Sequence, residues 1–193
     1  MALRIAFLLA AGAALSGSVA GAQVPPPAVQ ISGAVSALPE SLRAGATVLG
    51  YSNYHRLVTL RQGTNAMICL ADDPSQRDWH VACYHKDLDP FMARGRELRQ
   101  LGAKRAQIDS VRLAEAKAGT LKMPDHPSAL YSLFGSGDNV NAQTGIAAGA
   151  EPLYVIYLPY ATAETTGLPT LPGGGKPWLM YPGMPWAHVM ISP

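Results

Sequence analysis

The two cysteines, Cys69 and Cys83, constrain the fold of this chain more than any other feature of its sequence. They are the only cysteines in the chain, and residues 70–82 separate them. Because paired cysteines in an exported protein normally form a disulfide, we expect a covalent link between two nearby segments. Closing a loop of this length stabilises a fold by about 3 kcal/mol on the chain-entropy model. That is a large share of the roughly 5–15 kcal/mol of a typical domain.

The N-terminal residues predict export. One cation, Arg4, precedes an apolar run that ends in the small residues of "AGA" (20–22), which is the build of a secretory signal peptide. The run is short for a membrane span of about 20 residues. We therefore expect a signal peptide over 1–22, a Pro-rich lead-in over 23–30 and a single domain over 31–193. The mature protein is expected in the periplasm or outside the cell, without a membrane span.

The charge of the mature chain argues against a nucleic-acid partner. The chain has 15 Lys and Arg against 13 Asp and Glu, and signal cleavage removes Arg4, so the mature protein is close to neutral. Nucleic-acid binding normally requires a strongly basic surface. The densest basic stretch, 94–105, lies largely on one predicted helix and is interpreted as its solvated face. The sequence identifies no other partner and no oligomeric state.

Three helices are predicted from periodicity and capping signals. Apolar residues at 31, 35, 38 and 42 predict a short amphipathic helix, with Pro39 near its end. Pro90 suits the first position of a second helix, which continues over 91–101 and which Asp87 or Asp89 can cap. The third helix is expected over 107–118.

Apolar runs predict the strands, which lie at 46–51, 55–60, 66–71, 79–84, 128–134, 152–160, 178–181 and 186–191. The second and third of these runs flank "RQGTN" (61–65), which predicts a β-hairpin. Residues 135–152 have no period and predict a long loop. The predicted fold class is α+β: a mostly antiparallel sheet of five or six strands, two or three helices and one disulfide. Helices and strands alternate too irregularly for a doubly wound sheet.

A zinc site is the main alternative to the disulfide. Cys69, His80, Cys83 and His85 are four nitrogen and sulfur ligands, and structural zinc requires four that converge. Side chains alternate along a strand, so a strand over 79–85 directs His80 away from Cys83 and His85. A helix would leave His85 outside the group. The disulfide is therefore favoured, and no metal or other cofactor is expected.

The catalytic candidates are His85, Asp87 and His188. A histidine oriented by a carboxylate is a plausible general base, as in His85 beside Asp87. The competing interpretation is that Asp87 and Asp89 cap the helix at Pro90, and we favour it because it explains all three residues. His188 lies on an apolar strand face and is interpreted as a core histidine.

Two loop segments carry weaker signals. His126 lies between prolines and is expected to be exposed, while Asp72 and Asp73 precede a proline and predict a turn. The long loop 135–152 offers a possible ligand pocket against the sheet, rimmed by Tyr154, Trp178 and Trp186. The competing interpretation is that these aromatic residues fill the core.

Two stretches, "LRQGTNAMICLADDP" (60–74) and "KPWLMYPGMPWAHVMISP" (176–193), resemble an uncharacterised family of secreted bacterial proteins. Met184 and Trp186 replace the Thr and Tyr that are usual in the second motif. The resemblance implies export and a Cys69–Cys83 pairing, and it supplies no activity. It also places Asn65 and His188 among the positions to test.

These observations favour a protein without catalysis. Every catalytic template that we compared with the chain fails on spacing. The expected function is therefore an exported globular binding or envelope-associated module, with an unassigned ligand. The alternative is a metal-dependent or histidine-based hydrolase using His85 and His188, because functional groups converge in space and not in sequence.

Overall fold

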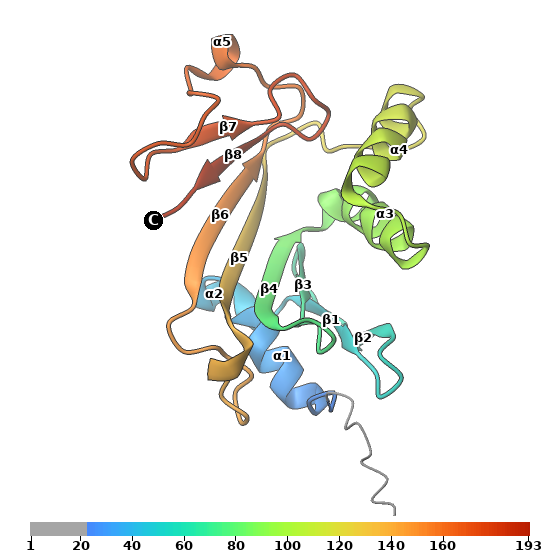
Figure 1. Cartoon of the computed structure of the whole chain (residues 1–193), viewed down its shortest axis with the longest axis vertical. Helices are drawn as coiled ribbons and strands as arrows, with labels where there is room; N and C mark the ends of the chain where they lie inside the picture. Colours follow the sequence, from blue (N-terminus) through green and yellow to red (C-terminus); the bar gives the residue numbers. More distant parts are fainter. Residues whose placement is uncertain (1–22) are drawn as a thin grey trace, which may run out of the picture.

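The computed structural model describes residues 23–193, and the predicted signal peptide lies outside them. An eight-stranded sheet in the order β2-β1-β3-β4-β5-β6-β8-β7 runs through this part of the chain (Figure 1). The strands are β1 (Thr47–Tyr51), β2 (Leu57–Arg61), β3 (Met67–Leu70), β4 (Asp78–His85), β5 (Ser128–Ser136), β6 (Glu151–Tyr157), β7 (Trp178–Met180) and β8 (His188–Ile191). Neighbours are antiparallel except β1 and β3, which run parallel.

The helices pack against both faces of the sheet. They are α1 (Pro27–Val35), α2 (Glu40–Arg43), α3 (Asp89–Gln100), α4 (Arg105–Lys117) and α5 (Ala163–Thr166). Helix α1 lies against β1 to β4, while α3 and α4 form a pair on the other side (Figure 1). No helix within residues 23–193 is long and apolar enough to cross a membrane.

The structure confirms an α+β fold, although the predicted counts of strands and helices were too low. The predicted hairpin around 61–65 is wrong, because β1 lies between β2 and β3. The connection crosses the start of β1, where the amides of Thr64 and Asn65 donate to the carbonyl of Gly45 at 2.7 and 2.9 Å. A side chain on Gly63 would collide with the backbone of Thr47. Glycine is therefore needed for this close crossing.

The helix predicted from the apolar residues at 31, 35, 38 and 42 is divided in two. Helix α1 ends at Val35, and α2 begins after Pro39. Proline disfavours helical backbone in the residue before it, which explains the break. Leu38 is nevertheless buried in the same cluster as the end of α1, so the periodicity identified the correct buried face.

The disulfide joins two adjacent strands. Cys69 on β3 lies directly opposite Cys83 on β4, and the predicted pairing is confirmed. Both cysteines are fully buried in a cluster that α1 covers, together with Trp79 and Val81 of β4. The bond therefore fixes β3 to β4 beneath α1.

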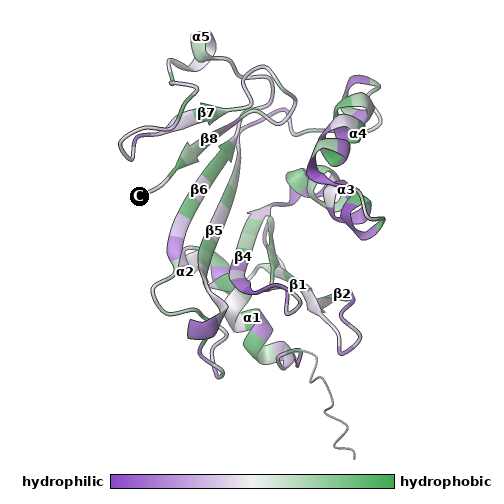
Figure 2. Cartoon of the chain, in the orientation of Figure 1, coloured by the Kyte–Doolittle hydropathy of each residue, from purple (hydrophilic) through white to green (hydrophobic). Residues whose placement is uncertain are grey.

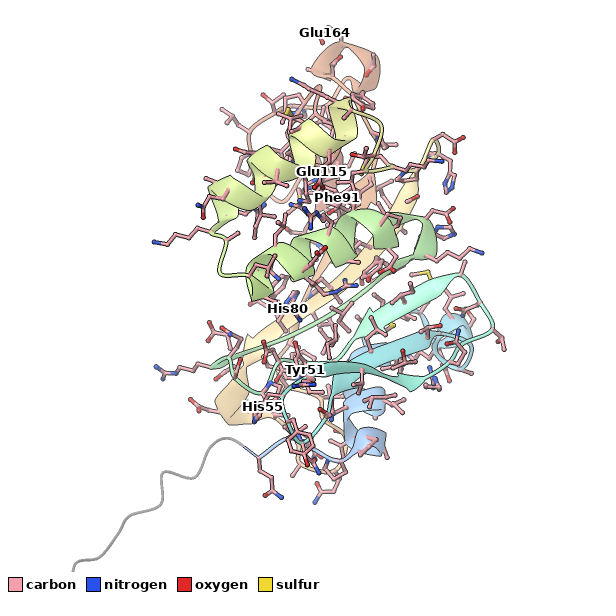
Figure 3. The ribbon with its side chains drawn as sticks, turned by 90° about the vertical axis from the view of Figure 1, so that its right-hand side faces the viewer. Tyr51, His55, His80, Phe91, Glu115 and Glu164 are labelled. Carbon is pink, nitrogen blue, oxygen red and sulfur yellow. A yellow bond between two sulfur atoms is a disulfide. The ribbon has the colours of Figure 1, made fainter. Side chains whose placement is uncertain are left out.

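A second cluster fills the opposite face. Tyr84 follows Cys83 on β4 and points to the other side of the sheet, as alternation along a strand requires. It packs in one cluster with Leu88, Phe91 and Trp186. Phe91, which Figure 3 labels, belongs to α3 and is buried in this cluster. Helices α3 and α4 both mix hydrophilic and hydrophobic residues (Figure 2), and apolar residues of both belong to this cluster.

Candidate functional site

The end of β4 positions the first two residues of the site. The strand ends at His85, and a 3₁₀ turn over Lys86–Leu88 leads into α3. The Nδ1 atom of His85 accepts a hydrogen bond from the amide of Asp87 at 3.4 Å. Leu88 has no exposed surface and packs in the cluster under α3. This burial holds the turn in place and leaves the side chains of His85 and Asp87 near the surface.

The third residue, His126, comes from the segment that precedes β5. Strands β4 and β5 pair antiparallel, with Tyr84 opposite Leu130. The start of β5 therefore lies beside the end of β4. This pairing brings His126 next to Asp87, although the two residues are 39 positions apart in the sequence.

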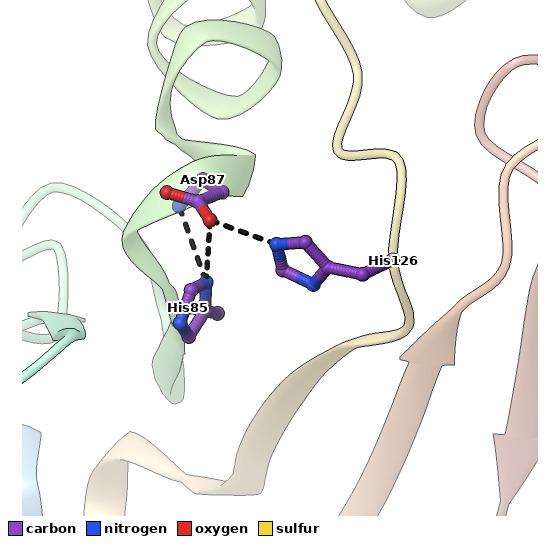
Figure 4. Close-up of side chains that lie close together, drawn as sticks. All are labelled: His85, Asp87 and His126. Carbon is purple, nitrogen blue, oxygen red and sulfur yellow. Dashed lines mark hydrogen bonds and ion pairs between the residues drawn. The ribbon is translucent and has the colours of Figure 1, made fainter.

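The three side chains form one cluster (Figure 4). Oδ2 of Asp87 lies 2.9 Å from Nε2 of His126 and 3.5 Å from Nδ1 of His85. One ligand atom from each of the three residues lies within 4.8 Å of the other two. The side chains of His85, Asp87 and His126 are 28%, 40% and 45% exposed, so the cluster is open to solvent.

Hydrogen bonds set the charge of the cluster. The bond from His126 lowers the pKa of Asp87, and the charge of His85 lowers it further. The pKa of His126 is raised, first by its hydrogen bond to the carbonyl of Pro127 and then by Asp87. Asp87 is therefore an ionised carboxylate at neutral pH.

Two oxygen atoms beside Nδ1 orient the ring of His126. Its Nδ1 lies 3.2 Å from the carbonyl oxygen of Pro127 and 3.3 Å from Oγ of the buried Ser128. When Nδ1 carries the proton and donates to this carbonyl, the lone pair of Nε2 is free for a metal ion, which would replace the hydrogen bond to Asp87. Metal-bound histidines usually donate their second ring nitrogen in this way.

Comparisons with protein-family models, with curated proteins and with solved structures found no match for this chain. The functional argument therefore depends on the geometry of the side chains. Two imidazoles and one carboxylate are a donor set for zinc and for other divalent transition metals. Zinc bonds of about 2.0–2.1 Å in a tetrahedral site hold neighbouring donors about 3.3 Å apart. The separations of 2.9 and 3.5 Å at Asp87 bracket this value.

The capping interpretation of Asp87 and Asp89 is wrong. The residue before α3 is Leu88, and no side chain caps the helix. Asp89 instead accepts hydrogen bonds from the hydroxyl of Tyr84 at 2.8 Å and from Arg96 at 3.1 Å. The 3₁₀ turn ahead of the helix places the carboxylate of Asp87 beside His85 and His126.

The structure does not bring His188 to His85. His85 pairs with Met67, which belongs to the cluster under α1, while His188 pairs with Tyr157 in the opposite cluster. Directly paired residues share a face of the sheet, so the two histidines lie on opposite faces. His188 is buried, its Nδ1 lies 2.7 Å from the carbonyl of Trp186, and burial lowers its pKa.

The alternative four-residue zinc set is not formed. Cys69 and Cys83 are joined in the disulfide, and neither has a free thiol. Nε2 of His80 lies 2.7 Å from Oγ of Ser132, and its ring stacks on Phe134 at a centroid distance of 4.3 Å. His80 therefore has its own partners, on the face of the sheet opposite to the cysteines.

The three aromatic ligand candidates are spread over the molecule. The ring of Tyr154 meets Tyr131 edge-on at 5.7 Å. Trp178 lies on the edge strand β7, and Trp186 is buried against Phe91. The structure does not bring the three together around the long loop.

Asn65 has a structural position in the crossing between β2 and β3. Its Nδ2 donates to the carbonyl of Leu42 at 2.8 Å, and its Oδ1 accepts from the amide of Met67 at 2.9 Å. Both ends of the amide are occupied within the chain. These bonds hold the start of β3 against α2.

Sequence reasoning missed His126 as a member of the site. It lies in a loop between prolines, and no local pattern links it to His85 and Asp87. The available signal was its place two residues before the predicted strand at 128–134. That signal becomes useful only when the partner of this strand is known.

Proposed function

We propose that the protein is an exported metal-binding module that holds one divalent transition-metal ion, with zinc as the best fit, between His85, Asp87 and His126. The observation that carries the proposal is the mutual separation of their ligand atoms, all within 4.8 Å. Imidazole nitrogen favours zinc, copper or nickel over calcium and magnesium, which prefer oxygen ligands. The proposal departs from the sequence-based expectation that the chain binds no metal.

The disulfide supports the export part of this proposal, because such bonds persist in oxidising compartments. The signal-peptide pattern and the resemblance to secreted bacterial proteins point the same way. We place the protein in the periplasm or outside the cell.

A second candidate function is a metal-dependent hydrolase built on the same residues. The cluster is exposed and supplies three protein ligands, which leaves a coordination position for water. His188 would take no part, since it lies on the other face of the sheet. The binding module remains the first proposal because no further acid or base of the described residues belongs to this cluster.

Metal titration tests the proposal. The protein, expressed from its full chain and purified without chelator or affinity tag, should bind about one equivalent of zinc in calorimetry. We expect His126→Ala and Asp87→Asn each to weaken zinc binding about tenfold or more. The control is His55→Asn, at an exposed histidine with φ of 54°, because Asn tolerates this backbone conformation. The proposal fails if zinc does not bind, or if all three variants bind like the wild type.

Hydrolysis is measured on the zinc-loaded protein with ester, phosphodiester and peptide substrates. Turnover that Asp87→Asn removes and His55→Asn retains would favour the hydrolase. Stoichiometric zinc without turnover would favour the binding module.

A further inference from the structure

A cavity of about 510 Å³ lies between α1, β4 and the loop after β5. This volume falls within the range of about 300–1,000 Å³ that is typical of small-molecule sites. Apolar side chains provide most of its walls, among them Val24, Val29, Val81, Val140 and Ala142. The cavity shares no residue with the cluster of His85, Asp87 and His126.

The walls of the cavity are held in place by hydrogen bonds. Nε1 of Trp79 donates to the carbonyl of Gly145 at 3.1 Å and ties the loop to β4. Within the loop, the amide of Gly145 donates to the carbonyl of Asn141 at 2.8 Å. Oδ1 of Asn141 also accepts from the amides of Gln143 and Thr144. The cavity is therefore preformed.

Asp72 is the one ionisable side chain among the lining residues. Its Oδ1 accepts a hydrogen bond from the backbone amide of His80 at 2.9 Å. Within residues 23–193 no Lys, Arg or His forms an ion pair with it. Burial raises the pKa of Asp72 to about 6. At neutral pH the cavity therefore holds a partly desolvated negative charge without a cation.

Gln30, one of the uncharged polar residues of the wall, is satisfied within the chain. Nε2 of Gln30 donates to the carbonyls of Pro25 and Tyr51 at 2.7 and 2.9 Å. Its Oε1 accepts from the amide of Tyr51 at 2.7 Å. Gln30 is thus engaged by the backbone, and Asp72 is the charged group available to a ligand.

A second cavity borders Asp72 on the side of α3. It has a volume of about 630 Å³ and is lined by Tyr51, His55 and His80, which Figure 3 labels, and by Arg96 and Arg99. The carboxylates of Asp73 and Asp78 line it as well, so its walls are polar and carry charges of both signs. In the apolar cavity, by contrast, Asp72 is the single charged side chain of the lining, so an ammonium group that binds there meets no competing cation.

We propose that the apolar cavity binds a small aliphatic or aromatic amine, with its ammonium group at Asp72 and its hydrocarbon part against Trp79 and the valines. An anion would meet the carboxylate with no cation beside it. A neutral apolar molecule would desolvate Asp72 further without replacing its hydrogen bonds to water, which is costly. A cation replaces these hydrogen bonds and gains the attraction of a poorly screened charge. The proposal is independent of the metal site.

Three probes of equal chain length test the proposal: n-hexylammonium, 1-hexanol and hexanoate. Binding to the full protein is measured at pH 7.5 by calorimetry and by tryptophan fluorescence. We expect hexylammonium to bind about tenfold more tightly than hexanol, as a charge-assisted hydrogen bond implies. Hexanoate should bind more weakly than both. Equal binding of the amine and the alcohol, or no binding of the amine, would overturn the proposal.

Asp72→Asn keeps an oxygen for the amide of His80 and removes the charge. It should reduce hexylammonium affinity to that of hexanol, about tenfold, and leave hexanol within about twofold. The matched control is Asp73→Asn, at a neighbouring carboxylate that does not line this cavity. An unchanged amine affinity in Asp72→Asn, or an equal loss in Asp73→Asn, would contradict the proposed contact.

A blocking variant tests the location separately. Ala142 is exposed and lines the cavity, so Ala142→Trp should fill the space without disturbing the core. We expect it to abolish binding of both hexylammonium and hexanol, whereas His126→Ala should leave both unchanged. Retained amine binding in Ala142→Trp would show that the amine binds elsewhere and would overturn the proposal.

Discussion

Nε2 of His126 lies 2.9 Å from Oδ2 of Asp87, across 39 positions of sequence. This contact depends on the pairing of β4 with β5, because His126 precedes β5 and Asp87 follows β4. His85, at the end of β4, lies within reach of the same carboxylate oxygen. The sheet therefore assembles the candidate metal site from two segments that have no local relationship.

Ser128→Ala should weaken zinc binding without a large loss of stability. Oγ of Ser128 lies 3.3 Å from Nδ1 of His126 and helps to orient the ring. Partners of this kind typically change metal affinity about tenfold or more, and we expect the lower end because Pro127 offers a second acceptor. Calorimetric titration with zinc measures the effect.

Ser132→Ala is the matched control for this prediction. Ser132 lies on the same strand, is equally buried and hydrogen-bonds to His80 and to the carbonyl of Val81, away from the site. Its zinc affinity should equal that of the wild type. A similar loss in both variants would mean that Ser128 acts through the general stability of β5.

The sequence predicted individual elements better than their arrangement. The strand at 79–84 and the helix after Pro90 were identified because apolar runs and proline positions are local signals. The insertion of β1 between β2 and β3 was not, because strand pairing depends on contacts between distant segments. The signal "RQGTN" (61–65) predicted a hairpin, whereas this segment crosses the start of β1.

The candidate site was also predicted only where its signals are local in the sequence. His85 and Asp87 were recognised together because two positions separate them. His126 was not, because only the pairing of β4 with β5 brings it there. Asp72 was predicted in a turn, but a cavity formed by α1 and the loop after β5 has no signature in a local sequence window.

Gly63→Ala should destabilise the fold strongly. A Cβ atom at this position would collide with the backbone of Gly45 and Thr47, which cannot move without shifting β1. We expect a loss of about 1–3 kcal/mol in the free energy of unfolding, measured by urea denaturation. Gly173→Ala is the control, since a Cβ atom added there would have no neighbour within 4 Å and the φ of Gly173 is not positive. That variant should stay within about 0.5 kcal/mol of the wild type.

Removing the disulfide should lower the free energy of unfolding by about 3 kcal/mol. The double variant Cys69→Ala, Cys83→Ala tests this, because both residues are fully buried and alanine leaves no unpaired thiol. Urea denaturation of the variant is compared with that of the oxidised and reduced wild type. A variant as stable as the oxidised protein would show that pairing of β3 with β4 needs no covalent link.

Asp72→Asn should stabilise the protein above pH 6. Burial raises the pKa of Asp72 from 3.8 to about 6, so the folded state binds this proton more tightly than the unfolded state does. The contribution of Asp72 to the free energy of unfolding must then fall as the pH rises between these two values, and this loss persists above them. Asparagine carries no charge and keeps the hydrogen bond from the amide of His80. Asp72 is only half-buried, so solvent screening reduces the effect below the full linkage value. We expect the variant to be more stable than the wild type by about 1–2 kcal/mol at pH 7.5, and equal to it near pH 3.5.

Urea denaturation at a series of pH values measures this difference between Asp72→Asn and the wild type. Asp73→Asn is the control. It should retain most of the wild-type dependence on pH, because Asp72 keeps its carboxylate and burial is the main cause of its raised pKa. The prediction is contradicted if the free energy of unfolding of the wild type, of Asp72→Asn and of Asp73→Asn rises by the same amount between pH 4 and 6. That result would mean that Asp72 is solvated and carries an ordinary pKa, since only a raised pKa makes the folded state lose stability as this carboxyl ionises.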